Sequence, residues 1–331
     1  MAGGHSYRKR GQRKVSGEER EGAFHRGERA VQARVGVAAR MARIGEHAIR
    51  GSMSEQHRQF FTQLPFVLVG SIDSAGQPCA SLLAGPPGFV HAPDGRTLRI
   101  DATTIAADPL ADNLRVAAPV GVLGIQAHTR RRNRANGVVT AVHAQGVTIT
   151  VAQSFGNCPK YIQAREATYT GPRPAARFAG SPGLTEADAR LIGNADTFYI
   201  ATAHPDAVRA GTRAHGVDVS HRGGRPGFVR IDDEGRLHVP DFIGNFFFNT
   251  LGNLEVHPLA GLLFVDHASG DLLSLATSVA VIWDGPEVAA FAGAQRVLRF
   301  TPTAVRVARA ALPLRFGPAE LSPHLAGTGT W

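Results

Sequence analysis

The chain has 331 residues, 43% of them hydrophobic, which is enough to fill the cores of two ordinary domains. Its formal net charge is +9, but residues 1–50 alone hold 12 Lys and Arg against 5 Glu, so the basicity lies mainly at the N-terminus and does not indicate a nucleic-acid-binding body. No apolar run approaches the roughly 18 residues of a transmembrane helix, and the two cysteines are too few for a disulfide framework. We therefore expect a soluble, cytoplasmic protein that binds neither membranes nor nucleic acid.

Residues 1–29 are rich in Gly, Arg and Glu and hold few apolar side chains, which predicts a disordered leader. Apolar residues at helical spacing then predict two helices, at 30–49 and 53–64. Short apolar segments separated by Gly, Pro and Asp turns follow, a pattern typical of an antiparallel barrel or sandwich. These predicted strands are 66–72, 78–83, 88–90, 97–100, 120–125, 137–142 and 147–153.

A second series of elements follows residues 168–183, which are rich in Pro, Gly and Ala and are predicted to be a linker. The cap Thr185-x-x-Asp188 predicts a helix at 185–191. The predicted strands are 197–202, 227–231, 236–239, 260–266, 272–283 and 296–300, with a helix at 249–256 between them. The chain is thus divided into domains at 30–167 and 184–331.

The two halves of the chain repeat each other. Gly88-Phe-Val90, Asn113-Leu114 and Gly121 recur 139 to 140 residues later as Gly227-Phe-Val229, Asn253-Leu254 and Gly261. A repeat of this length indicates two copies of a whole domain, because solenoid repeats are only a few tens of residues long. Two such copies can form a site between them.

The densest polar motif surrounds the start of the helix expected at 249–256. Free N–H groups at a helix N-terminus attract phosphate, and polar side chains there can add donors. The first copy has Pro109 and Leu110 at this place, which favours an anion site in the second copy only. The alternative is a helix capped by Asn and Thr, without a ligand. The candidate residues are Asn245, Asn249, Thr250 and Asn253.

A second motif lies at 218–228, where arginines and a hydroxyl stand beside glycines and allow close approach of an anionic or planar ligand. The alternative is a hairpin loop with solvated arginines. His221 could donate a proton, or could simply make hydrogen bonds in the loop. The candidates in this motif are Ser220, His221, Arg225, Gly227 and Phe228.

The third motif contains Lys160, the only lysine outside the leader in a chain with 36 Lys and Arg. Donors and an aromatic face are what a flavin ring requires, and Asn157, Pro159 and Tyr161 accompany this lysine. The alternative is a strand end capped by Asn-x-Pro.

A fourth motif, Arg130 to Arg134, would place Arg130, Arg132 and Arg134 on one face if it forms a strand. These arginines could contact a phosphate held by the other copy, or be solvated. No sequence signature identifies a catalytic residue. A metal site is not expected, because nothing in the sequence spacing of Asp218, His221, His257 and His267 brings them together.

Taken in order, these motifs resemble the pyridoxamine 5′-phosphate oxidase-related, FMN-binding split-barrel superfamily, in its tandem form. The resemblance runs from about Ala23 to Trp331. It is carried by Glu55-Gln-His-Arg58, Phe60-Phe-Thr-Gln-Leu-Pro65, Arg131-Arg-Asn-Arg134, Ser154-Phe-Gly-Asn-Cys-Pro159, Asp218-Val-Ser-His-Arg-Gly-Gly224 and Asn249-Thr-Leu-Gly-Asn-Leu254.

The resemblance implies a mainly β fold of two tandem FMN-binding split barrels, each with six strands, and FMN at the seam between them. It implies that Asn245, Asn249, Thr250 and Asn253 hold the phosphate end, with Arg132, Arg134 and Arg225 as further candidates. The oxidases carry an Arg-Lys pair about where this chain has Asn249-Thr250, which implies less cationic phosphate binding here.

The function implied is that of an FMN-dependent oxidoreductase acting on a small, unidentified substrate. The alternative is a non-catalytic flavin carrier. An electron donor such as NAD(P)H would be a separate molecule, and a homodimer is compatible with this arrangement.

Overall fold

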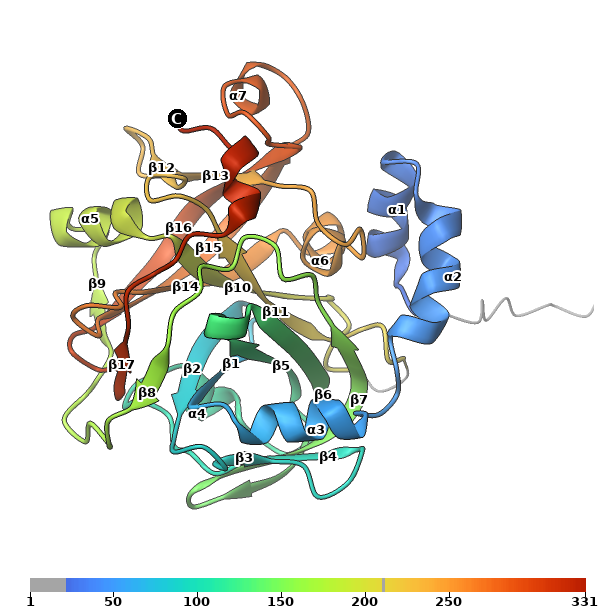
Figure 1. Cartoon of the computed structure of the whole chain (residues 1–331), viewed down its shortest axis with the longest axis vertical. Helices are drawn as coiled ribbons and strands as arrows, with labels where there is room; N and C mark the ends of the chain where they lie inside the picture. The colour runs from blue at the N-terminus through green and yellow to red at the C-terminus, as the bar shows by residue number, and fades with distance from the viewer. Residues whose placement is uncertain (1–21, 210–211) are drawn as a thin grey trace, which may run out of the picture.

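The computed structural model describes residues 22–209 and 212–331, and its fold is mainly β, as the sequence predicts (Figure 1). The disorder expected for residues 1–21 lies outside the described ranges. Two large antiparallel sheets dominate the molecule. We call them the N-terminal barrel, strands β1 to β7, and the C-terminal barrel, strands β10 to β16.

The strands of the N-terminal barrel are β1 Phe66–Ile72, β2 Pro78–Ala84, β3 Val90–His91, β4 Thr97–Ile100, β5 Pro119–Gln126, β6 Arg131–His143 and β7 Gly146–Gly156. Those of the C-terminal barrel are β10 Thr197–Ala203, β11 Val217–Gly223, β12 Arg230–Ile231, β13 Leu237–Asp241, β14 Leu259–Val265, β15 Leu272–Ile282 and β16 Arg296–Ala308. The strand order is β2-β1-β5-β6-β7-β4-β3 in the first and β11-β10-β14-β15-β16-β13-β12 in the second. Each of these strands therefore has a counterpart at the same place in the other barrel, and the two-residue strands β3 and β12 bring each barrel to seven strands instead of the expected six. The sheet of the C-terminal barrel has an eighth strand, at Ala179–Ser181, which pairs with β16.

The barrels pack against each other through equivalent glycines. A Cβ on Gly121 of β5 would lie 2.5 Å from the carbonyl oxygen of Val217 on β11. A Cβ on Gly261 of β14 would lie 2.4 Å from that of Pro78 on β2. Real Cβ contacts are longer than this, so both close crossings of the backbones require glycine. A shared apolar layer, which includes Leu68 and Leu263, fills the space between the barrels.

The helices cover the ends and one side of the barrels. α3 (Glu55–Thr62) and α5 (Glu186–Asn194) precede the first strand of each barrel, and Thr185 and Asp188 form the expected capping box at α5. α4 (Leu110–Asn113) and α6 (Asn249–Val256) occupy equivalent places inside the two repeats. None of the helices in the described ranges is long and apolar enough to cross a membrane. The remaining short elements are α7 (Pro286–Ala289) and the 3₁₀ turns η1 (Ala127–Thr129) and η2 (Pro323–Gly327).

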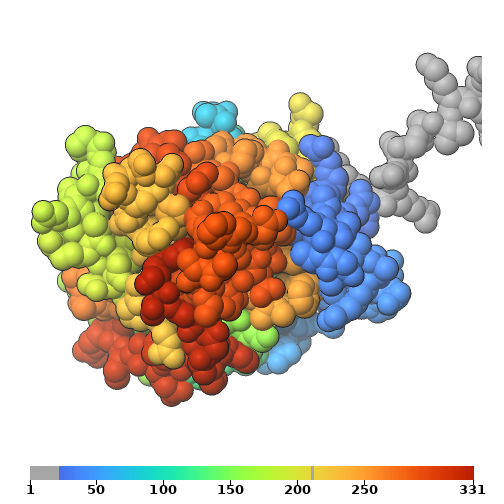
Figure 2. Space-filling view, turned by 90° about the horizontal axis from the view of Figure 1, so that it is seen from above, coloured from blue at the N-terminus to red at the C-terminus, as the bar shows by residue number. Residues whose placement is uncertain are grey.

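The N-terminal helices form a lobe at one side of the molecule, coloured blue in Figure 2. They are α1 (Arg26–Arg34), capped by His25, and α2 (Ala38–Ala48). α1 lies against α6 (Figure 1), and a Cβ on Gly27 would lie 2.1 Å from the carbonyl oxygen of Gly252. The expectation that the disordered leader extends to residue 29 is therefore wrong for its described end, because close contact with α6 orders it.

The segment expected to be a linker also carries strands. β8 (Ala167–Tyr169) pairs with β17 (Leu314–Phe316), and β9 (Ala179–Ser181) pairs with β16. Main-chain pairing thus ties this segment to the C-terminal barrel. The domain boundaries at 30–167 and 184–331 stay a prediction.

Candidate site between the barrels

A pocket opens where the two barrels meet. The N-terminal barrel contributes strand β6 and the loop after β7, and the C-terminal barrel contributes β11, the end of β13 and the loop that leads into α6. The structure brings together here most residues that the sequence motifs singled out. These are Arg132, Arg134, Asn157, Lys160, Tyr161, Ser220, His221, Phe228, Asn245, Asn249 and Thr250.

The first wall of the pocket is the arginine strand β6. Arg132 donates to the carbonyl oxygens of Cys158 (2.8 Å) and His221 (3.3 Å). Arg134 forms a buried ion pair with Asp218 at 3.0 Å and donates to Ser220. Strand alternation places both arginines on the face toward β11. Arg130 lies elsewhere, because it precedes β6 in a left-handed conformation and pairs with the exposed Glu320.

The second wall is β11, which the sequence did not predict as a strand. Its residues from Asp218 to Arg222 are polar except Val219 but lie along the seam, and Arg222 forms an ion pair with Asp241 of β13. A Cβ on Gly223 would lie 2.1 Å from the carbonyl oxygen of Tyr161, so this glycine allows the barrels to meet at the pocket. Arg222 was not selected from the sequence. It is two residues after Ser220, so strand alternation would have identified it.

The third wall is the start of α6. Asn249 accepts a hydrogen bond from Arg134 (2.9 Å) and donates to Glu28 of α1 (2.6 Å), and Thr250 donates to Ser220 (3.1 Å). Phe246 and Phe248, just before the helix, have φ of 63° and 62°. Left-handed conformations are uncommon for aromatic residues and gather at ligand clamps. The polar groups of this wall are thus already joined to the arginines.

The fourth wall is the loop after β7. Asn157 has a buried Nδ2 with no hydrogen-bond partner among the described residues. Lys160 is half-buried and forms no hydrogen bond or ion pair within the described ranges. Tyr161 donates to the carbonyl oxygen of Ile243 (3.2 Å) and so joins this loop to the one before α6. The loop therefore presents two donors, Asn157 and Lys160, to the pocket.

The pocket is cationic. Burial and the neighbouring Arg134 and Arg222 guanidinium groups lower the pKa of Arg132 to about 9, and burial also lowers the pKa of Arg134. Burial above all, and the neighbouring positive charges as well, disfavour the charged forms of these arginines, and a bound anion would favour them. The expectation of less cationic phosphate binding stays a prediction. Asn249 and Thr250 carry no charge, whereas Arg132 and Arg134 of β6 and Arg222 of β11 bring positive charge to the pocket lining.

His221 faces the pocket as a neutral group. Burial, together with Arg132, Arg165 and Arg222, holds the pKa of His221 well below its usual range. Its Nε2 lies 3.4 Å from the hydroxyl of Thr197. A histidine with so low a pKa carries no proton to donate as an imidazolium near neutral pH.

Four predicted site residues do not line the pocket. Arg225 points toward the carbonyl oxygen of Leu325 (3.5 Å), and Gly227 forms a turn with φ of 87°. Pro159 lines a neighbouring hollow with Asn157. Asn253 is buried and donates to Thr202 (3.1 Å), as Asn113 donates to Ser71 (2.9 Å) in the first barrel. Because both copies keep this bond, Asn253 is a structural residue.

The sequence motifs also missed the apolar and acidic part of the lining. Besides Arg222, the pocket is lined by Cys158, Gly223, Pro240, Asp241, Phe242, Gly244, Phe246, Phe248 and Leu251. The run Phe242 to Phe248 was visible in the sequence, but nothing in it indicated which rings turn inward.

Residues 53–178 match the family model described as pyridoxamine 5′-phosphate oxidase. The N-terminal barrel belongs to this split-barrel family. The C-terminal barrel shares its strand order, so the chain is a tandem of two split barrels. The family match covers less of the chain than the resemblance suggested. No curated protein matches the chain.

Three solved structures are similar to one half of this chain. A protein from Lactobacillus delbrueckii described as a putative pyridoxamine 5′-phosphate oxidase is 18% identical, with 38% of this chain and 94% of that chain covered and a TM-score of 0.29. HupZ from Group A Streptococcus is 15% identical, with 45% and 99% covered and a TM-score of 0.25. HutZ from Vibrio cholerae, described as a heme storage protein, is 11% identical, with 43% and 99% covered and a TM-score of 0.26.

Proposed function

We propose that the pocket between the barrels binds FMN and that the protein is an FMN-dependent oxidoreductase acting on a small molecule. The observation that carries the proposal is the convergence of Arg132, Arg134 and Arg222 with Lys160 at the seam of two split barrels. Two carboxylates, Asp218 and Asp241, offset part of this charge. The surplus positive charge suits a phosphate dianion.

The chemistry of the donors fits a flavin nucleotide. The Nδ2 of Asn157 and the Nε of Arg222 are buried N–H groups without partners among the described residues, and buried donors of this kind are costly unless a ligand satisfies them. The pocket itself encloses about 120 Å³, less than the roughly 300 Å³ or more of typical cofactor sites. Arg134 and Arg222 are paired with carboxylates, Asp218 and Asp241, so binding of a whole FMN would require such lining side chains to move.

When bound, FMN would supply the two-electron chemistry, and the protein would supply binding and electrostatics. Arg132 and Asn157 would hold the ligand by hydrogen bonds, and Lys160 would add a mobile positive charge. His221 would contribute a neutral hydrogen-bonding ring. No side chain is needed as a covalent catalyst.

Titration of the full chain with FMN and with riboflavin, followed by quenching of flavin fluorescence, tests the proposal. We expect FMN to bind at least about tenfold more tightly than riboflavin, since one hydrogen bond to a charged group contributes about 1.5–3 kcal/mol. R132Q should abolish most of this preference, whereas R306Q, a change outside the pocket, should not. Equal binding of both flavins, or none, would overturn the proposal.

The same purified protein separates an enzyme from a flavin carrier. Rapid mixing of the FMN-loaded protein with NADH or NADPH should bleach the flavin absorbance if the protein is an oxidoreductase. A parallel titration with hemin measures whether the pocket binds heme instead of FMN. Heme is the alternative to test because His221 is of a residue type that binds heme iron. Tight hemin binding without FMN binding would replace the flavin proposal.

A further inference from the structure

The connection between β10 and β11 is longer than its counterpart in the first barrel. It covers residues 204–216, whereas the equivalent turn between β1 and β2 covers residues 73–77. The longer connection carries His204, Asp206 and His215, and the short turn contains no histidine. This cluster lies outside the pocket described above.

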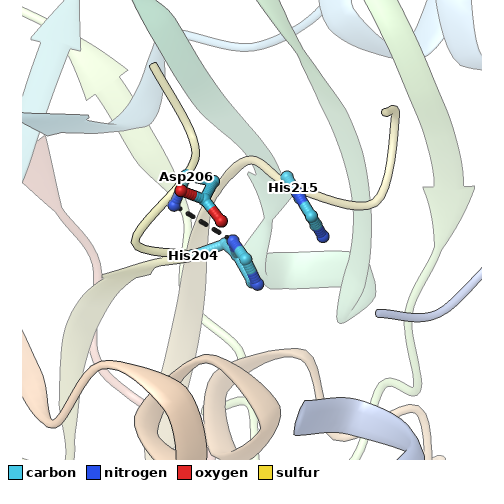
Figure 3. A group of neighbouring side chains, drawn as sticks. All are labelled: His204, Asp206 and His215. Carbon is cyan, nitrogen blue, oxygen red and sulfur yellow. Dashed lines mark hydrogen bonds between the residues drawn. The ribbon is translucent and has the colours of Figure 1, made fainter. Parts of the chain in front are cut away.

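The three side chains converge (Figure 3). One ligating atom of each of His204, Asp206 and His215 lies within 4.8 Å of the other two. His204 is buried, and the other two are half-buried. Within the described part of the chain this is the group of His, Cys, Asp and Glu residues that is close enough to hold an ion, and the set Asp218, His221, His257 and His267 is not.

A further imidazole lies beside the cluster. The ring of His25 is 4.9 Å from that of His204 and 6.3 Å from that of His215. The Nδ1 of His25 accepts a hydrogen bond from the backbone of Gly27 at the start of α1. The cluster therefore joins the long connection to the N-terminal lobe.

We propose that His204, Asp206 and His215 form a binding site for a divalent transition-metal ion of the zinc class. Two imidazoles and one carboxylate suit Zn²⁺, Co²⁺ or Ni²⁺ better than Ca²⁺ or Mg²⁺, which prefer oxygen ligands. Three protein ligands leave at least one coordination position for water or an exogenous ligand. The ion would join the two ends of the β10–β11 connection to each other, close to the His25 ring.

Metal binding requires a local change in the imidazoles. The rings of His204 and His215 are stacked with centroids 3.7 Å apart and an angle of 6° between them. Because a metal lies in the plane of each imidazole that binds it, at least one ring must turn. The Nδ1 of His204 also accepts a hydrogen bond from the backbone of Asp206 (3.1 Å), which binding through this nitrogen would break.

Titration of untagged, chelator-treated full-length protein with Co²⁺ tests the site, because cobalt bound to nitrogen ligands has visible absorption bands. We expect one Co²⁺ per chain, displaced by Zn²⁺. H215Q and D206N, which change half-buried residues, should each weaken Co²⁺ binding at least about tenfold. Loss of a residue that only hydrogen-bonds a metal ligand already costs about tenfold in metal affinity, so loss of a ligand should cost at least as much. H47Q changes an exposed histidine on α2 and should leave binding intact.

Absence of cobalt bands in the wild-type protein, together with no retained Zn²⁺ by elemental analysis, would overturn the proposal. Binding that is unchanged in both H215Q and D206N would overturn it as well. The wild-type result does not depend on the folding of any variant, and none of these measurements involves FMN.

Discussion

The seam between the barrels holds two pockets related by the repeat, and they differ in the chemistry of their walls. The second pocket lies between β2, α4, β15 and β16, the counterparts of β11, α6, β6 and β7. The sheet registers place Ser274 where the first pocket has Arg134, and Cys79 where it has Asp218. Arg306 is the cation that lines the second pocket.

The comparison separates structural residues from candidate ligand-binding residues. Both copies keep the close-contact glycines, Gly121 and Gly261, and the asparagine bond made by Asn113 and Asn253. The buried arginine–aspartate pair occurs in one copy only. We therefore expect one FMN per chain, bound in the first pocket.

The largest effects on FMN binding and on stability are expected when the first pocket is given the residues of the second. R134S should abolish FMN binding, and it leaves the buried Asp218 without its partner, which costs roughly 3–5 kcal/mol of unfolding free energy. The double variant R134S/D218C should regain most of that stability but none of the binding. Urea unfolding and FMN titration of both variants provide the measurements. A double variant as unstable as R134S would show that the pair is not the cause.

The contact of α1 with α6 is a further difference between the two copies, because in the described part of the chain α4 packs against β1 and β2 and not against a helix of this kind. Burial raises the pKa of Glu28 to about 8, so this carboxyl is protonated in the folded protein and ionised in the unfolded chain between about pH 4.5 and 8. The contribution of Glu28 to stability is therefore present below about pH 4.5 and is lost as the pH rises toward 8. The unfolding free energy of the wild type relative to E28Q should fall by up to about 1.4 kcal/mol per pH unit in this window. A difference that does not change with pH would contradict the burial of Glu28.

Substitution of the two close-contact glycines tests whether the two contacts between the barrels are equivalent. G121A and G261A should each destabilise the fold by about 1–3 kcal/mol, because the new methyl group would meet a carbonyl oxygen of the other barrel. G180A places its methyl group in open space and serves as the control. Thermal unfolding of the three variants should show two similar losses and one small change. A large loss in only one of the two glycine variants would show that the crossings are not equivalent.

The smallest effect is expected at the helix start. N249P/T250L gives α6 the residues of α4, and Pro is tolerated at the first helical position. The variant loses the Asn249 and Thr250 bonds to Arg134 and Ser220. FMN affinity should fall about tenfold, which corresponds to about 1.4 kcal/mol. Unchanged flavin affinity in the folded variant would assign binding to the arginine strands alone.

Strands with apolar segments flanked by turn residues could be predicted from the sequence. Elements whose polar residues or glycines form contacts between packed parts of the molecule could not. β1 and β4 have the predicted bounds because turn residues flank their apolar segments. β11 was missed because its buried polar residues have the composition of a loop. The helix predicted at 30–49 covers the second half of α1 and all of α2. It misses the start of α1 because Gly27 and Glu28 pack against α6 by close approach and hydrogen bonding rather than through an apolar stripe.

Most residues that the sequence motifs named do line the pocket, but the motifs did not identify all of its lining. The difference between the two copies pointed to the start of α6, and the sequence motifs named residues from all four walls of the pocket. That these residues bind a ligand stays a prediction. Arg225 was chosen over Arg222 because strand alternation cannot be applied to a segment predicted as a loop. Asn253 does not line the pocket, which the sequence could not indicate because its hydrogen bond to Thr202 joins distant parts of the sequence.

The presence of both barrels in one chain has an evolutionary consequence. In a symmetric dimer, every substitution appears at both equivalent sites, so a change that helps one is imposed on the other. Once the two copies are encoded in tandem, each seam mutates independently. The arginines of β6 and the long β10–β11 connection are changes of this kind, since each is present in one copy and absent from the other. Duplication within a single gene thus lets one half of the protein acquire residues that the other half does not carry.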